Sequence, residues 1–202
     1  IFSASNFWGL QKEYNATWYS AVPTIHQILL IRADQDQAPE KSFRFIRSCS
    51  AALAPSVLVD LEERFGAPVL EAYGMTEASH QMSSNPMPPE ERKAGSVGKP
   101  TGVEINIMSM ESMGDMLETN KIGEVVIKGE NVTSGYHNNN DANKDSYVNG
   151  WFRTGDIVRK KKNNLYLIGR VDNQFNIPRV STHGAMNALQ MRIALAKGRY
   201  KL

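Results

Sequence analysis

A strand, a helix and a second strand between residues 43 and 73 restrict the fold of this chain more than any other feature. Residues 43–48 are predicted to form a strand, Pro55 suits the first turn of a helix, and Gly66 suits its end. Residues 69–73, an apolar run, are then predicted to form a second strand. Two strands joined by a helix lie parallel in one sheet, so this part of the chain is predicted to be α/β. The helix has one apolar face, made by Leu58, Leu61 and Phe65.

The sequence changes character after about Gly102. Strand patterns follow at residues 103–108, 123–129 and 151–154, and residues 157–161 and 165–168 are predicted to pair as a hairpin. One short polar helix is expected within residues 138–147. The prediction is therefore three parts: residues 1–102 belong to an α/β subdomain, residues 103–170 to a mainly-β, barrel-like subdomain, and residues 171–202 to a hinge and a divergent remnant.

Composition excludes several classes of protein. The net charge of +2 is too small to predict a nucleic-acid partner, and no run approaches the ~18 apolar residues of a membrane span. Cys49 is the only cysteine, which excludes an internal disulfide. The start of the chain lacks a secretory pattern and is not a methionine, so we expect an intracellular fragment.

Tyr73, Gly74, Met75, Thr76 and Glu77 form the first stretch that suggests chemistry. They follow a predicted parallel strand, and open α/β sheets bind ligands at the carboxyl ends of such strands. A planar ring, a glycine, a hydroxyl and a carboxylate within five positions suit a nucleotide with a metal ion. A strand end with a turn and a solvated glutamate is the alternative.

Two further stretches, Thr154-Gly155-Asp156 and Gly169-Arg170-Val171-Asp172, are also expected where strands end. A carboxylate such as Asp156 can accept hydrogen bonds from both hydroxyls of a ribose. Each stretch taken alone is equally typical of an ordinary turn or of a surface ion pair.

The order and spacing of these stretches together resemble the adenylate-forming superfamily, which includes acyl-CoA synthetases, luciferases and peptide-synthetase adenylation domains. The resemblance runs from Phe2 to about Ile177. The finer match is to the oxalate–CoA ligase branch of plants and fungi. The segments similar to the superfamily are residues 16–27, 48–55, 73–77, 95–100, 123–136, 154–156 and 169–170. The segments similar to the oxalate–CoA ligase branch are residues 16–27, 45–50 and 83–86.

The resemblance implies a ligase that joins a carboxylic acid to coenzyme A and converts ATP to AMP and pyrophosphate, with Mg²⁺. It implies that Glu77 holds the metal ion, that Thr76 bonds the α-phosphate, and that both are catalytic. Asp172 would be the hinge of a mobile lid. His26 either faces the acid pocket, where it could pair with a carboxylate of a short diacid, or is a packed or exposed helix histidine. The nucleotide would contact Ser50, Ala51, Ala52, Tyr73, Gly74, Met75, Thr76, Asp156 and Arg170.

Two parts of the family pattern are absent from these 202 residues. They are the Ser/Thr/Gly-rich phosphate loop and the lid with its catalytic lysine, since residues 178–202 follow no such pattern. We therefore expect the chain alone to be inactive. We expect it in the cytoplasm, with the peroxisome as an alternative for which the chain has no standard C-terminal signal. Alternatives are a non-catalytic AMP-binding remnant, with the full-length enzyme as its partner, and an aromatic acid ligase resembling 4-coumarate–CoA ligases.

Overall fold

The computed structural model describes residues 2–39 and 43–171 of the chain. They divide into two compact units. The first contains the residues up to Thr76 together with His80–Thr101, and the second contains Glu77–Ser79 and the residues from Gly102 onward. Among the residues described, no helix has the length and apolar character that crossing a membrane requires.

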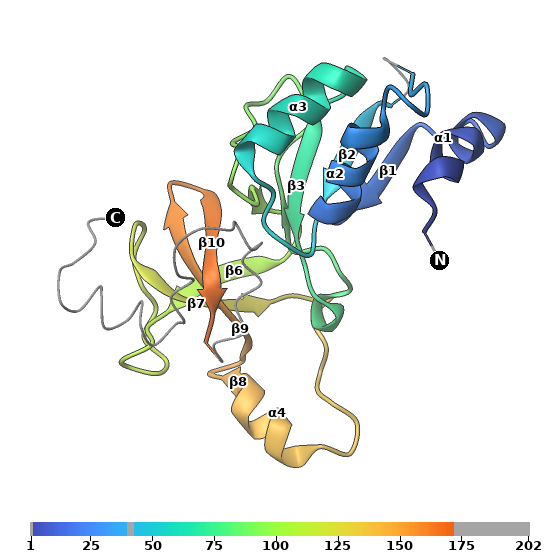
Figure 1. Cartoon of the computed structure of the whole chain (residues 1–202). Coiled ribbons are helices and arrows are strands. Elements are labelled where there is room, and N and C mark those ends of the chain that lie inside the picture. The colour runs from blue at the N-terminus through green and yellow to red at the C-terminus, as the bar shows by residue number, and fades with distance from the viewer. Residues whose placement is uncertain (1, 40–42, 172–202) are drawn as a thin grey trace, which may run out of the picture. The chain divides into compact units, whose positions relative to one another are not determined.

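A five-stranded sheet forms the centre of the first unit (Figure 1). The strands β1 (Trp18–Ala21), β2 (Phe45–Ser48) and β3 (Val69–Tyr73) lie side by side and parallel. The short strands β4 (Ser83–Ser84) and β5 (Lys99–Pro100) extend the sheet in the antiparallel sense. The predicted parallel arrangement of the strands before and after the helix is confirmed.

Three helices pack against this sheet: α1 (Ala4–Glu13), α2 (Pro23–Arg32) and α3 (Pro55–Phe65). The predicted ends of α3 are confirmed, because Pro55 opens its first turn and Gly66 follows it in the left-handed conformation at φ 60°. All three helices share one core with the sheet. Its large apolar side chains include Trp8, Leu29, Phe43, Ile46, Leu53, Leu58, Leu61, Phe65 and Val69.

The second unit is a curved antiparallel sheet with the strand order β10-β9-β7-β6 (Figure 1). The short strand β8, which follows the helix α4 in the chain, also pairs with β9 but is not part of this four-strand order. The predicted combination of a parallel α/β part with a mainly-β part is therefore confirmed. The elements are β6 (Glu104–Met108), β7 (Ile122–Lys128), α4 (Asn140–Ser146), β8 (Tyr147–Val148), β9 (Trp151–Lys161) and β10 (Asn164–Arg170).

One feature of β9 differs from the prediction. Residues 151–154 and 157–161 were expected as separate strands with Thr154-Gly155-Asp156 at a strand end, but β9 is continuous. Glu124 of β7 lies opposite Ile157 and Val126 lies opposite Arg153, so Val125 alone faces three residues of β9. The expected turn is therefore a β-bulge inside a strand, with Gly155 at φ +73°. A glycine in a strand pattern signals a turn and a bulge equally well, and only the pairing partner distinguishes them.

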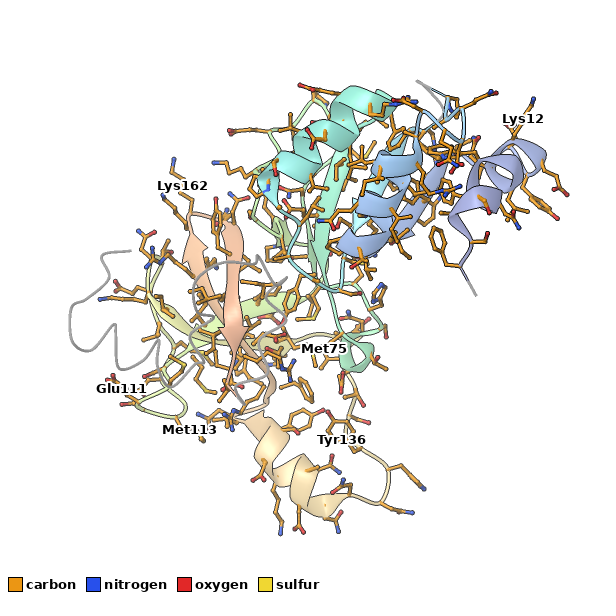
Figure 2. The ribbon with its side chains drawn as sticks, viewed as in Figure 1. Lys12, Met75, Glu111, Met113, Tyr136 and Lys162 are labelled. Carbon is orange, nitrogen blue, oxygen red and sulfur yellow. The ribbon has the colours of Figure 1, made fainter. Side chains whose placement is uncertain are left out.

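The hairpin of β9 and β10 is confirmed. Lys161 pairs with Asn164, which leaves a tight two-residue turn in which Lys162 has φ +56°. Lys162 stands at the tip of this hairpin (Figure 2). Gly169 and Arg170 were expected after the second strand, but both belong to β10, which has a second irregularity between Leu167 and Gly169.

Candidate nucleotide-binding site

The turn after β3 is built by close approach of the backbone to itself. A Cβ atom placed on Gly74 would lie 1.3 Å from the carbonyl oxygen of His80, so only glycine fits there. The His80 amide donates to the Met75 carbonyl at 2.9 Å, and the Met82 amide donates to the Tyr73 carbonyl at 3.0 Å. Tyr73 is buried, whereas Thr76 is exposed at the end of the turn. The sequence motif thus folds into one rigid turn at the carboxyl end of a parallel strand.

The small-residue loop follows β2 at the same edge of the sheet. Ser50, Ala51 and Ala52 are all exposed, and Ser50 has the left-handed φ of 70°. The two alanines have small side chains, which suits a loop that a flat ligand can approach. Contact of these three residues with the adenosine remains a prediction.

Arg47 lies at the carboxyl end of β2 and was not among the predicted site residues. Its guanidinium donates to the Ser20 hydroxyl at 3.1 Å and to the Gln81 side-chain oxygen at 3.0 Å. The Nε2 atom of His80 lies 3.4 Å from Arg47 Nη1. Among the residues that the structure describes, no carboxylate is within ion-pair distance of this guanidinium. A guanidinium without a carboxylate partner in the described part of the chain therefore lies at the carboxyl edge of the parallel strands.

His26 is completely buried in α2. The hydroxyl of Tyr19 lies 3.1 Å from its Nδ1 atom. Burial lowers the pKa of the imidazole to about 4, so the ring is neutral at pH 7. A neutral ring can hold a carboxylate by a hydrogen bond but not by an ion pair. Its predicted contact with the acid stays a prediction.

Glu77 is held by the segment that follows β7, within the second unit. The Thr133 amide donates to the Glu77 carbonyl at 2.7 Å, and the Asn131 side chain donates to the Ala78 carbonyl at 2.9 Å. The Tyr136 hydroxyl, labelled in Figure 2, donates to Glu77 Oε1 at 2.8 Å. Burial, together with the hydrogen bond to Glu77, raises the pKa of Tyr136 to about 12. The phenol is therefore a hydrogen-bond donor that orients the carboxylate.

Asp156 and Arg170 lie together in the second unit. Arg170 Nη1 is 3.0 Å from Asp156 Oδ1, and the Val171 amide donates to the Gly155 carbonyl at 2.7 Å. Two residues predicted to contact the ribose, 14 positions apart, thus form one ion pair. Asp172, the predicted hinge, lies outside the described residues.

The predicted site residues therefore form two groups. Tyr73, Gly74, Met75 and Thr76 share a turn of the first unit, whereas Glu77, Asp156 and Arg170 belong to the second. Convergence of both groups on one cleft remains a prediction. Sequence reasoning missed Arg47, Glu124 and Tyr136. A charged residue within an apolar strand pattern is a signal that could have identified the first two.

The donor set around Glu77 is compatible with a magnesium nucleotide. No group of three or more His, Cys, Asp or Glu side chains that could hold a metal ion occurs among residues 2–39 and 43–171. Mg²⁺ is commonly bound by one or two carboxylates, with substrate phosphates and water completing its shell. A single oriented carboxylate fits that pattern and does not fit a metal site made by protein ligands alone.

Comparison with known proteins shows which family has this arrangement. Residues 2–137 match the profile of the AMP-binding enzyme family. The chain belongs to the AMP-binding enzymes. An oxalate–CoA ligase of Arabidopsis thaliana is 56% identical over 178 residues, which cover 87% of this chain and 34% of that protein. An oxalate–CoA ligase of Saccharomyces cerevisiae is 50% identical over 178 residues, which cover 87% of this chain and 32% of that protein.

Solved structures of this family agree with the fold. The O-succinylbenzoate–CoA synthetase of Bacillus subtilis, in its unliganded form, has a TM-score of 0.74 at 33% identity and covers 85% of this chain and 37% of its own. The same enzyme in complex with ATP and magnesium has a TM-score of 0.73 at 30% identity, and the match covers 92% of this chain and 37% of that chain. The chain thus spans about a third of the length of the curated relatives that it matches.

Proposed function

We propose that this chain is part of an acid–CoA ligase that activates a short dicarboxylic acid with ATP and transfers the acyl group to coenzyme A. Oxalate is the acid that we propose. The proposal is supported by membership of the AMP-binding family and by the names of two relatives, oxalate–CoA ligases at 56% and 50% identity. In the first step a carboxylate oxygen attacks the α-phosphorus of ATP, giving an acyl-adenylate and pyrophosphate. In the second step the coenzyme A thiol displaces AMP.

The residues of the chain would act mainly on the nucleotide. Tyr73 packs against the adenine, the Thr76 hydroxyl donates to the α-phosphate, and Asp156 accepts hydrogen bonds from the ribose hydroxyls, with Arg170 beside it. Glu77 would hold Mg²⁺, which offsets phosphate charge when bound. Tyr136 keeps the Glu77 carboxylate in one orientation through its 2.8 Å hydrogen bond.

The observation that carries the preference for an anionic acid is Arg47. Its guanidinium contacts Ser20, His80 and Gln81 at the carboxyl edge of the sheet, and no carboxylate of the described residues is within ion-pair distance of it. A planar guanidinium is well suited to binding a carboxylate with two hydrogen bonds. The second carboxylate of a diacid would provide that partner, whereas the ring of an aromatic acid would not.

Calorimetry with the purified 202-residue chain tests the nucleotide part of the proposal. Because the family's phosphate loop is not among these residues, we expect weak AMP binding and little additional affinity for ATP. ATP binding much tighter than AMP binding would show that the phosphate site is misassigned. With oxalate, ATP, Mg²⁺ and coenzyme A, we expect no turnover from the chain alone. Turnover that Glu77→Ala abolishes would contradict this, and turnover that survives it would identify a contaminant.

The acid is tested by titrating the AMP-loaded chain with oxalate and with 4-coumarate. We expect oxalate to bind and Arg47→Met to weaken it about tenfold or more, since a hydrogen-bonded charge pair is lost. AMP binding should be unchanged in that variant. Tighter binding of 4-coumarate, or oxalate binding that does not depend on Arg47, would favour an aromatic acid ligase.

A further inference from the structure

Glu124 is a carboxylate buried in the middle of a sheet. It lies in β7, is only 3% exposed, and is followed by the buried residues Val125, Val126 and Ile127. Burying a carboxylate is costly unless both of its oxygens find donors. Glu124 Oε2 accepts from Arg153 Nη2 at 2.8 Å and from Arg153 Nε at 3.1 Å. Its other oxygen accepts from the backbone amide of Gly155 at 3.1 Å.

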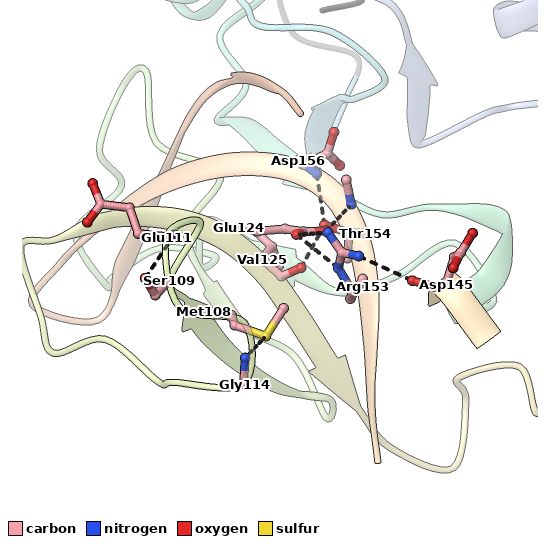
Figure 3. Close-up of polar contacts among 11 residues, drawn as sticks. Met108, Ser109, Glu111, Gly114, Glu124, Val125, Asp145, Arg153, Thr154 and Asp156 are labelled. Carbon is pink, nitrogen blue, oxygen red and sulfur yellow. Dashed lines mark hydrogen bonds and ion pairs between the residues drawn. The ribbon is translucent and has the colours of Figure 1, made fainter. Parts of the chain in front are cut away.

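These contacts lie at the bulge of β9 (Figure 3). The Thr154 hydroxyl donates to the Val125 carbonyl at 2.9 Å and accepts from the Asp156 amide at 3.1 Å. Arg153 also donates to the carbonyl of Asp145 at the end of α4, at 3.3 Å. The ladder between β7 and β9 is interrupted at this point, so side chains of Glu124 and Thr154 replace the missing backbone pairing.

We infer that Glu124, together with Arg153, is a positioning residue for the ribose-binding carboxylate. The pair fixes the amide of Gly155, and Thr154 fixes the amide of Asp156. These two amides determine where the backbone leaves the bulge and therefore where the Asp156 carboxylate points. This inference rests on the proposed function, because it assigns the ribose to Asp156. Glu124 acts through the backbone and does not itself contact the nucleotide.

The test compares the binding of AMP with that of 2′,3′-dideoxy-AMP to the wild-type chain and to Glu124→Gln, by calorimetry. Glutamine has the same size but lacks the charge that Arg153 requires. The wild-type chain should prefer AMP, because only AMP has the hydroxyls that Asp156 accepts from. In Glu124→Gln we expect this preference to fall about tenfold, while the affinity for the dideoxy nucleotide stays the same. If Glu124 had a purely structural role, its substitution would weaken the binding of both nucleotides equally.

Glu104→Gln is the matched control, since Glu104 is an exposed glutamate on the neighbouring strand β6 and should leave the preference unchanged. If Glu124→Gln does not fold, Thr154→Val is the second variant, because it removes one hydroxyl and keeps the ion pair. An unchanged preference in the folded variants, with a clear preference in the wild type, would overturn the positioning role alone. A wild-type chain that binds both nucleotides equally would instead contradict the assignment of Asp156, and the inference with it.

Amide hydrogen exchange provides a readout without nucleotide. We expect exchange at Gly155 to be about tenfold faster in Glu124→Gln, because its hydrogen bond to the carboxylate is weakened. Exchange at amides of β6 that open locally should not change, whereas amides that exchange only through global unfolding report the overall loss of stability. Equal exchange at Gly155 in both proteins would show that Glu124 does not hold the bulge.

Discussion

The two units hold their predicted nucleotide-binding segments in different ways. In the first unit the turn after β3 is shaped by backbone against backbone, with Gly74 directly against the His80 carbonyl. In the second unit the bulge of β9 is held by side chains, and a Cβ on Gly155 would meet only the end of Arg170, at 3.2 Å. The first segment is therefore sensitive to volume, and the second to charge.

The buried glutamates of the two units show the same contrast. Glu71 of β3 is 4% exposed, and its carboxylate accepts from the Gly95 amide at 2.8 Å. In the described part of the chain no cation is within ion-pair distance of it, and burial raises its pKa to about 7. Glu124 is buried to a similar degree but is paired with Arg153. A carboxylate without a counter-charge should respond to pH, and a paired one should respond to loss of its partner.

The largest expected effect is that of adding a methyl group to the first turn. Gly74→Ala places a Cβ within 1.3 Å of a backbone oxygen, so the turn must rebuild, and we expect a loss of about 4 kcal/mol or more in the free energy of unfolding. Gly155→Ala mainly incurs the cost of a left-handed residue, about 1–2 kcal/mol. Urea unfolding of both variants measures the difference. Equal losses would contradict the contrast between the two segments.

The second expected effect is on the ion pair of the second unit. Glu124→Gln should lower the free energy of unfolding by about 3 kcal/mol, because it leaves Arg153 without its counter-charge. Arg153→Met should cost a similar amount, and the double variant should cost clearly less than the sum of both. Denaturant unfolding of the four proteins forms a double-mutant cycle. Additive losses would mean that the pair contributes no coupling and that the contrast with Glu71 is wrong.

The third prediction concerns pH and Glu71. Because burial raises the pKa of Glu71 from 4.5 to about 7, the folded chain binds more protons than the unfolded chain between these values. Glu71 should therefore contribute a fall in the free energy of unfolding as the pH rises from about 4.5 to 7, by at most about 3 kcal/mol, and no further change above. This slope is measured as the difference between the wild type and a Glu71 variant, because His26, whose pKa is lowered by burial to about 4, contributes a rise between about pH 4 and 6.5.

Glu71→Gln should remove this slope and stabilise the chain at pH 8, since an amide oxygen can still accept from Gly95. The exposed Glu104→Gln should retain the slope. Thermal unfolding between pH 4.5 and 8 compares the three proteins. A variant Glu71→Gln that is less stable than the wild type at pH 8 would show that the charged form of Glu71 is favoured in the folded state.

The sequence alone determined the elements whose signals are local. Pro55 and Gly66 defined both ends of α3, the apolar run at Val69–Tyr73 defined β3, and Gly74 indicated a turn at its end. Each of these signals depends on residues within a few positions, through helix-end geometry and the absence of a side chain. They were sufficient to identify the α/β and mainly-β parts and the motif that carries the family resemblance.

Tertiary structure alone decided the role of Glu124, the contacts of Arg47, and the bulge at Thr154-Gly155-Asp156. Glu124 meets Arg153 across 29 positions, and Arg47 meets Gln81 across 34. In both cases a charged residue within an apolar strand pattern gains its partner from another strand or from the turn beyond it. The physical reason is that strand pairing joins residues far apart in the chain, and a one-sided strand pattern does not specify what lies opposite it.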